Sequence, residues 1–117
     1  MADLTLFHNP KCSTSRKVQD ALEAAGTDFD TVLYLKAPPS RTDLERIVGH
    51  LDDPVSALVR HDNRFKELGL DPADYEDASA VVDLLVEHPE LLQRPLLETA
   101  DRAAIGRPWE AVVATFV

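Results

Sequence analysis

The sequence contains one cysteine, Cys12, among its 117 residues. A single thiol excludes a disulfide within the chain, a zinc site built from cysteines alone, and a redox cycle between two thiols of the same protein. No apolar run approaches the roughly 18 to 20 residues that a membrane-spanning helix requires. Residues 1–7 lack the basic region and the long apolar stretch of a secretory signal, so we expect a cytoplasmic protein without a membrane partner.

Basic side chains are also scarce. Twelve Lys and Arg residues stand against 21 Asp and Glu residues, which gives a formal net charge of −9. A field of this sign repels polyanions and disfavours binding to nucleic acid or to anionic lipid. Repeats, low-complexity tracts and linkers are missing too, so the length suits one domain, for which a monomer is the default expectation.

Apolar spacing predicts a β-α-β unit at the start of the chain. Residues 4–7 form a short apolar run that ends at an Asn-Pro turn, and residues 18–25 repeat with the period of one helix face. Gly26 stands where such a helix would end, and residues 29–35 are rich in β-branched and aromatic side chains. We expect two parallel strands joined by a helical crossover, with the second strand buried on both faces.

Residues 40–93 are patterned as a block of short helices, the first of which Ser40 can cap. Residues 96–98 and 102–105 flank a polar turn and predict an antiparallel hairpin. Pro108, at the first helical position, begins a last helix whose apolar face starts at Trp109. The predicted order is β-α-β, a helical block, then β-β-α.

Cys12 is the first candidate for chemistry. It follows a predicted strand and opens a predicted helix, whose free N–H groups and partial positive charge stabilise a thiolate and can cradle an anion. Lys11, Arg16 and a protonated His8 would add positive charge nearby. The alternative is that Cys12 is a small buried hydrophobic residue, as lone cysteines often are.

Residues 8–16 (HNPKCSTSR) resemble the signature of the glutaredoxin-dependent arsenate reductase family, ArsC, within the ArsC/Spx superfamily. Other stretches resemble the family in the same order and spacing: residues 33–35 (LYL), 38–41 (PPSR), 57–60 (ALVR), 88–89 (HP), 94–95 (RP) and 106–108 (GRP). The chain is nearer to the shorter subgroup, because longer members carry Gly where this chain has Ser13. The resemblance implies an α/β, thioredoxin-like fold in a single domain over residues 1–117, with a helical insertion at about 40–93 between the β-α-β and β-β-α units.

The resemblance also implies roles for four residues. Cys12 is expected to be the nucleophile, and Arg60, Arg94 and Arg107 are expected to bind the substrate oxyanion. Guanidinium groups suit this role because they bind tetrahedral oxyanions through paired, charge-assisted hydrogen bonds. Three of them would also lower the pKa of the Cys12 thiol.

Three further residues have expected roles near Cys12. His8 is expected to tune the thiolate, and the resemblance implies that Ser15 donates a hydrogen bond to it. Pro95 occupies the place of the cis-proline that faces the active-site cysteine in thioredoxin-like folds. The remaining histidines lie on different predicted elements, so we expect no metal site. Solvated faces or surface ion pairs are expected for the other arginines, Arg16, Arg41, Arg46, Arg64 and Arg102.

The function that the resemblance implies is thiol-dependent reduction of arsenate to arsenite, with no bound cofactor. Glutathione or an equivalent thiol would be the co-substrate and a glutaredoxin-type protein the partner, because one cysteine cannot complete the cycle alone. Two alternatives remain open. One is a regulator of the Spx type that binds RNA polymerase, many of which carry a Cys-x-x-Cys switch where this chain has Ser15. The other is a thiol-transfer enzyme that acts on another substrate.

Overall fold

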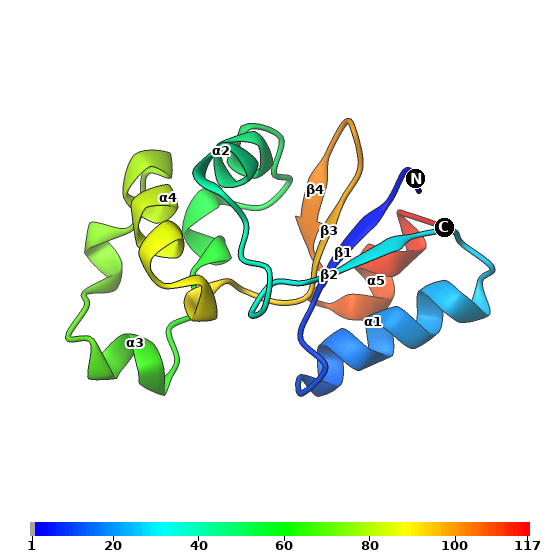
Figure 1. The fold of residues 1–117 in the computed structure, drawn as a ribbon, viewed down its shortest axis with the longest axis horizontal. Helices are drawn as coiled ribbons and strands as arrows, with labels where there is room; N and C mark the ends of the chain where they lie inside the picture. Colours follow the sequence, from blue (N-terminus) through cyan, green and yellow to red (C-terminus); the bar gives the residue numbers. More distant parts are fainter. Residues whose placement is uncertain (1) are drawn as a thin grey trace.

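The computed structural model describes residues 2–117, and in it a four-stranded sheet lies between helices (Figure 1). The strands are β1 (Thr5–His8), β2 (Asp30–Leu33), β3 (Leu96–Glu98) and β4 (Ala103–Ile105). The α-helices are α1 (Ser13–Ala24), α2 (Arg41–Gly49), α3 (Asn63–Glu67), α4 (Ala78–Glu87) and α5 (Trp109–Ala114). Short 3-10 helices are η1 (Val55–Leu58), η2 (Pro72–Asp74) and η3 (Pro89–Leu91).

The first three elements form the predicted β-α-β unit. Strand β1 pairs in parallel with β2, with Thr5 opposite Asp30 and His8 opposite Leu33. Helix α1 is the crossover between them, and its apolar positions Val18 and Leu22 are fully buried. The carboxyl ends of both strands therefore reach the same edge of the sheet as the amino end of α1.

The burial predicted for the second strand is wrong. The strand order β2-β1-β3-β4 places β2 at an edge, and its residues are exposed or half-buried. An edge strand has one neighbour only, so less of its surface is covered. Within residues 29–35 only Tyr34 is buried, directly after the strand ends.

The second half of the chain completes the sheet with the predicted hairpin. Strand β3 is antiparallel both to β1, with Leu97 opposite Leu6, and to β4. Helix α5 follows, but Pro108 is its N-cap residue with extended backbone and not its first helical residue. The fold is α/β and thioredoxin-like, with the helical insertion between β2 and β3, as expected.

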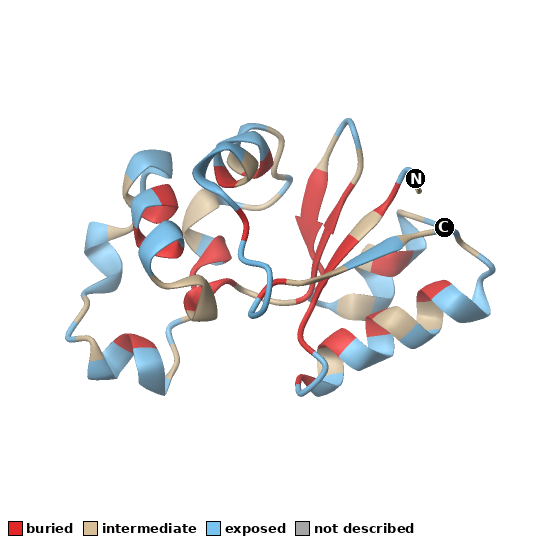
Figure 2. Ribbon diagram, in the orientation of Figure 1, coloured by how far each residue is buried: buried red, intermediate tan, exposed pale blue. Residues whose placement is uncertain are grey.

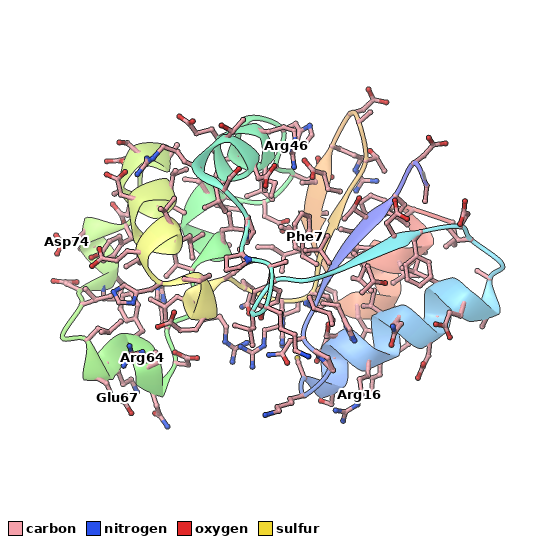
Figure 3. The ribbon with its side chains drawn as sticks, in the orientation of Figure 1. Phe7, Arg16, Arg46, Arg64, Glu67 and Asp74 are labelled. Carbon is pink, nitrogen blue, oxygen red and sulfur yellow. The ribbon has the colours of Figure 1, made fainter. Side chains whose placement is uncertain are left out.

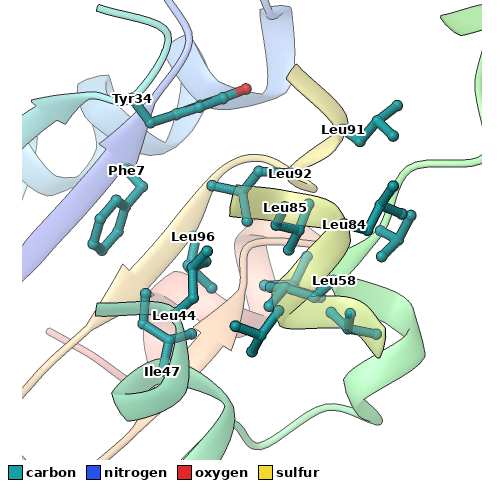
Figure 4. Packing of buried hydrophobic residues seen from close by; sticks show 14 of the residues in the cluster. Phe7, Tyr34, Leu44, Ile47, Leu58, Leu84, Leu85, Leu91, Leu92 and Leu96 are labelled. Carbon is teal, nitrogen blue, oxygen red and sulfur yellow. The ribbon is translucent and has the colours of Figure 1, made fainter. Parts of the chain in front are cut away.

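The sheet separates two apolar clusters, whose buried residues are red in Figure 2. Side chains alternate across a strand, so Leu6 faces one cluster and Phe7 the other. The smaller cluster packs the sheet against α1 and α5, with Trp109 against it. The larger one fills the space between the sheet and the insertion (Figure 4).

Two interactions within the insertion hold its shape. Ser40 caps α2 as predicted, because its Oγ accepts a hydrogen bond from the Asp43 N–H at 3.1 Å while the Ser40 N–H donates to the Asp43 carboxylate. Farther along, Val59 and Leu92 form an isolated antiparallel bridge. Segments on either side of the insertion's helices α3 and α4 are thereby held side by side.

Gly106 stands where two segments approach closely. A Cβ atom added to it would lie 2.7 Å from Cγ of Pro95, whose ring cannot swing aside. We expect Gly106→Ala to lower the free energy of unfolding by about 1–3 kcal/mol, because overpacking forces the neighbours apart. Urea unfolding measures this change. Gly49→Ala is the matched control, since nothing lies within 4 Å of its added Cβ; equal stabilities of the two variants would contradict the prediction.

Candidate active site

The loop between β1 and α1 places Cys12 at the amino end of the helix. Cys12 is the N-cap residue, with φ −92° and ψ 122°. Asn9 shapes the loop: its backbone carbonyl accepts a hydrogen bond from the Cys12 N–H, and its side-chain Oδ1 accepts one from the Lys11 N–H, both at 3.0 Å. Asn9 is itself buried, so these bonds hold the loop in one shape.

The Cys12 side chain is buried and its thiol is stabilised as an anion. Burial alone raises the pKa of the thiol, but the backbone N–H of Ser15, the Arg94 guanidinium and the backbone N–H of Thr14 outweigh it. The pKa of Cys12 therefore lies below its ordinary value. Free N–H groups at a helix start and a nearby cation are the surroundings of a reactive cysteine, not of an inert core cysteine.

His8 and Ser15 lie together under this loop, with contacts that differ from those predicted. His8 Nδ1 and Ser15 Oγ are 2.6 Å apart, and Ser15 Oγ also accepts a hydrogen bond from the Asn9 N–H at 3.1 Å. Burial, followed by the field of Arg16, lowers the pKa of His8, so at neutral pH the imidazole is neutral and adds no positive charge. Ser15 acts on Cys12 through its backbone N–H, while its hydroxyl bonds to His8 and Asn9.

Arg107 and Arg94 approach Cys12 from the other side. Arg107 Nη2 lies 3.6 Å from Cys12 Sγ, and Arg107 Nε donates a hydrogen bond to the Arg94 carbonyl at 2.9 Å. Arg107 is exposed whereas Arg94 is half-buried. Arg94 lowers the pKa of Cys12 through a side-chain hydrogen bond and its positive charge.

Arg60 reaches the same place from the insertion. The Arg60 N–H donates to the Leu91 carbonyl at 2.8 Å, next to the Val59–Leu92 bridge. Its Nη1 then donates to Oε1 of Gln93 at 3.0 Å, and the same oxygen accepts the Arg94 N–H at 3.2 Å. Gln93 thus links the two arginines.

A cavity of about 210 Å³ lies beside Arg60 and Arg107, and neither Cys12 nor Arg94 is among its lining residues. Its lining residues are Arg60, His61, Asp62, Gln93 and Arg107. Asp62 accepts a hydrogen bond from Arg60 Nε at 3.3 Å. Burial raises the pKa of Asp62, but hydrogen bonds from the Phe65 N–H and from Arg60 lower it by a larger amount. The carboxylate is therefore ionised and orients the Arg60 guanidinium. The cavity is polar and positive overall, which suits a small anion.

Pro95 follows Arg94 through a cis peptide bond, the isomer expected from the sequence. The Arg107–Pro108 bond is also cis, which we did not predict.

Arg94 Nε is buried, and no acceptor in the part of the chain that the structure describes lies within hydrogen-bonding distance. Arg94 therefore has a donor to offer to another group.

Arg107 contacts Cys12, Arg94 lowers its pKa, and Gln93 links Arg60 to the Arg94 backbone. The structure adds Gln93 and Asp62, which the sequence analysis missed, and it gives Asn9, expected only as a turn residue, a part in holding the loop. Their positions carried a signal, since each lies within three residues of a predicted site residue. Their roles depend on side-chain hydrogen bonds that only the folded chain forms.

Three of the five remaining arginines form surface ion pairs, as predicted. Arg41, Arg64 and Arg102 pair with acidic residues at the surface, and Arg16 donates to the Pro10 carbonyl at 2.8 Å. Figure 3 shows Arg46 and Arg64 on α2 and α3 of the insertion. Arg46 differs because it binds the buried Glu98 carboxylate with two hydrogen bonds, both of 2.9 Å.

Two general features of the described residues concern metals and membranes. Within residues 2–117, no group of three or more His, Cys, Asp or Glu side chains is arranged to hold a metal ion. Across the same residues, every helix is too short or too polar to cross a membrane. The site itself offers one thiolate and several guanidinium donors, which suits attack on a bound oxyanion.

Comparisons with known proteins agree with this geometry. A relative from Neisseria meningitidis serogroup B named arsenate reductase is 37% identical over 116 residues, with 97% of this chain and 98% of the relative covered. One from Escherichia coli, also named arsenate reductase, is 33% identical over 114 residues and covers 97% of this chain and 80% of its own length. The solved structure of an arsenate reductase from Vibrio cholerae superimposes with a TM-score of 0.83 at 34% identity, over 97% of each chain.

The family comparison covers the whole site. The model of the ArsC family matches residues 7–115, a span that includes Cys12, the three arginines and the insertion between them. On this match and on the relatives above, the chain belongs to the ArsC family.

Proposed function

We propose that this protein reduces arsenate to arsenite, with Cys12 as the nucleophile and Arg60, Arg94 and Arg107 as ligands of the oxyanion. The observation that carries the proposal is the approach of Arg94 and Arg107 to a buried thiol whose pKa is lowered. Membership of the ArsC family and the names of the relatives support the choice of arsenate.

The first step is a substitution at arsenic. The Cys12 thiolate attacks the arsenic of bound arsenate, an As–S bond forms, and one As–O bond breaks with loss of water after proton transfer to that oxygen. Arsenic keeps its oxidation state of +5 in this step. The arginines stabilise the negative oxygens throughout, because charge-assisted donors are strongest where water is excluded.

The reduction itself needs a second thiol. A low-molecular-weight thiol such as glutathione attacks the Cys12 sulfur, an S–S bond forms, and the As–S electron pair moves to arsenic, which becomes As(III) and leaves as arsenite. A glutaredoxin-type protein then attacks the mixed disulfide and releases the Cys12 thiolate. Both thiols come from outside, because the chain has one cysteine.

Release of the product follows from its charge. Arsenous acid is neutral at neutral pH, whereas arsenate carries between one and two negative charges. The guanidinium groups therefore bind substrate more strongly than product.

A groove beside the Cys12 loop supports an anionic thiol as co-substrate. The groove measures about 350 Å³ and is lined mainly by apolar atoms of the loop, Leu33 and Leu35. Lys11 and Lys36 line it as well, and both are exposed. Glutathione carries two carboxylates, which these lysines can attract, and methylene groups that can lie on this surface.

The two alternatives fit the site less well. A Cys-x-x-Cys switch of the Spx type cannot form, because the second position is Ser15, which is buried and bonded to His8. A thiol-transfer enzyme on a neutral substrate would leave the arginine groups without an anion to bind. The observations therefore favour an oxyanion substrate.

The nucleophile is tested by Cys12→Ser. We expect arsenate turnover in the presence of glutathione and glutaredoxin to fall by roughly a thousandfold or more, because a serine hydroxyl is not ionised at neutral pH. Turnover is measured as arsenite formed per enzyme. Ser13→Ala is the control, since the Ser13 side chain is exposed; wild-type turnover in Cys12→Ser would refute the proposed mechanism.

The pKa of Cys12 depends on Arg94. Arg94→Gln should raise this pKa, because a cation that stabilises the thiolate is lost. The ultraviolet absorbance of the thiolate as a function of pH measures it directly. Activity should follow the thiolate: it is lost as pH falls through the pKa of Cys12, and in Arg94→Gln the loss begins at higher pH. Arg41→Gln, which breaks a surface ion pair with Asp83, should leave the titration unchanged.

The co-substrate groove is tested by Lys36→Glu. Reversal of this charge should raise the KM for glutathione about twofold to fivefold, because a surface charge contributes modestly to binding of an anion. Lys66→Glu, on α3, changes the net charge equally without altering the groove. The same rise in both variants would attribute the effect to overall charge and not to the groove.

A further inference from the structure

Tyr34 occupies a place next to the site that no role explains so far. It directly follows β2, whose last residue, Leu33, lies opposite His8 in the parallel ladder. Tyr34 is therefore beside the start of the Cys12 loop. Its side chain is fully buried on the face of the sheet that packs against the insertion, as Figure 4 shows beside Phe7 and the labelled leucines.

The hydroxyl of Tyr34 is buried without a hydrogen-bond partner among residues 2–117. A buried hydroxyl without a partner costs free energy that a phenylalanine at the same place would not. Among residues 2–117, one other buried side-chain nitrogen or oxygen atom lacks a partner, and it is Nε of Arg94. Both donors without acceptors therefore belong to residues at or next to the candidate site.

The groups around the Tyr34 hydroxyl are the Asn9 side chain and two guanidinium groups, and none of them forms a hydrogen bond of ordinary geometry with it. Burial raises the pKa of Tyr34, and Arg94, the Asn9 side chain and Arg60 offset this only in part, so the phenol stays protonated. Guanidinium groups have no acceptor atom, so neither arginine can receive its proton. The field of Cys12 also acts on the hydroxyl, which places the phenol within the electrostatic reach of the reacting sulfur.

We infer that the Tyr34 hydroxyl donates a hydrogen bond to an oxygen of the anion that Cys12, Arg60, Arg94 and Arg107 bind. The inference rests on the proposed function and assigns that site a neutral donor besides its three cations. An anion oxygen supplies the acceptor that both Tyr34 and Arg94 lack. A neutral donor adds a bond to the substrate without adding a charge that would have to be neutralised after the product leaves.

Equilibrium binding of arsenate tests the inference. In a Cys12→Ser background, where no As–S bond forms, Tyr34→Phe should weaken arsenate binding about tenfold in calorimetry, as expected for loss of one hydrogen bond to an anion. The thermal midpoint without arsenate should stay the same or rise, because the substitution removes only an unsatisfied hydroxyl. A purely structural role predicts the opposite, a lower midpoint with unchanged affinity.

Tyr75→Phe in the same background is the matched control. Tyr75 is the second of the two tyrosines and packs edge-on against Phe65, with ring centroids 5.9 Å apart. Its loss should not change arsenate affinity. Equal affinity in all three proteins overturns the role of Tyr34 and leaves the oxyanion site intact, whereas no arsenate binding by the Cys12→Ser protein itself overturns the site and Tyr34 together.

A spectroscopic measurement removes any dependence on the stability of the variant. With tyrosine labelled by carbon-13 at the ring carbon that bears the hydroxyl, the Cys12→Ser protein has two signals, which the Tyr75→Phe substitution assigns. Arsenate should shift the Tyr34 signal and leave the Tyr75 signal in place. A Tyr34 signal that does not move at saturating arsenate refutes the inference.

Discussion

Negative charge at the amino end of α1 is the feature on which the arrangement of the site depends. The Cys12 sulfur is buried, and a buried anion is stable only where donors and cations surround it. The start of α1 contributes the N–H groups of Ser15 and Thr14. Arg94, just before β3, and Arg107, just after β4, contribute the cations. The surroundings that lower the pKa of the thiol are also those that bind an oxyanion, so one set of groups serves nucleophile and substrate.

The helical insertion contributes directly to the candidate site and is not only an addition to the thioredoxin-like core. Its bridge between Val59 and Leu92 brings Arg60 to the side chain of Gln93, and Gln93 also binds the Arg94 backbone. This local positive charge exists in a protein whose net charge is −9. The overall field opposes the approach of an anion and is weakened by salt, whereas contacts within the cavity are shorter than the screening length.

Much of the site was predictable because its signals are local. A strand, a turn with Asn-Pro and a capped helix identified the place of Cys12, and the arginines next to Pro95 and Pro108 matched a family pattern. The charge of His8 was not predictable, because it depends on burial and on Arg16. The contribution of Gln93 depends on its bond to Arg60, which joins distant segments that local patterns do not describe, whereas the bonds of Asn9 lie within its own turn.

The sequence by itself determined the order of elements, the single thiol and hence the need for an external one, and the residue types that can bind an oxyanion. These follow from periodicity, composition and side-chain chemistry, which are properties of the chain. The tertiary structure decided that β2 lies at an edge, that His8 is neutral, and that Tyr34 and Arg94 are left with donors to offer. Those outcomes depend on which surfaces are removed from water and which partners remain within reach, and packing of distant segments alone determines both.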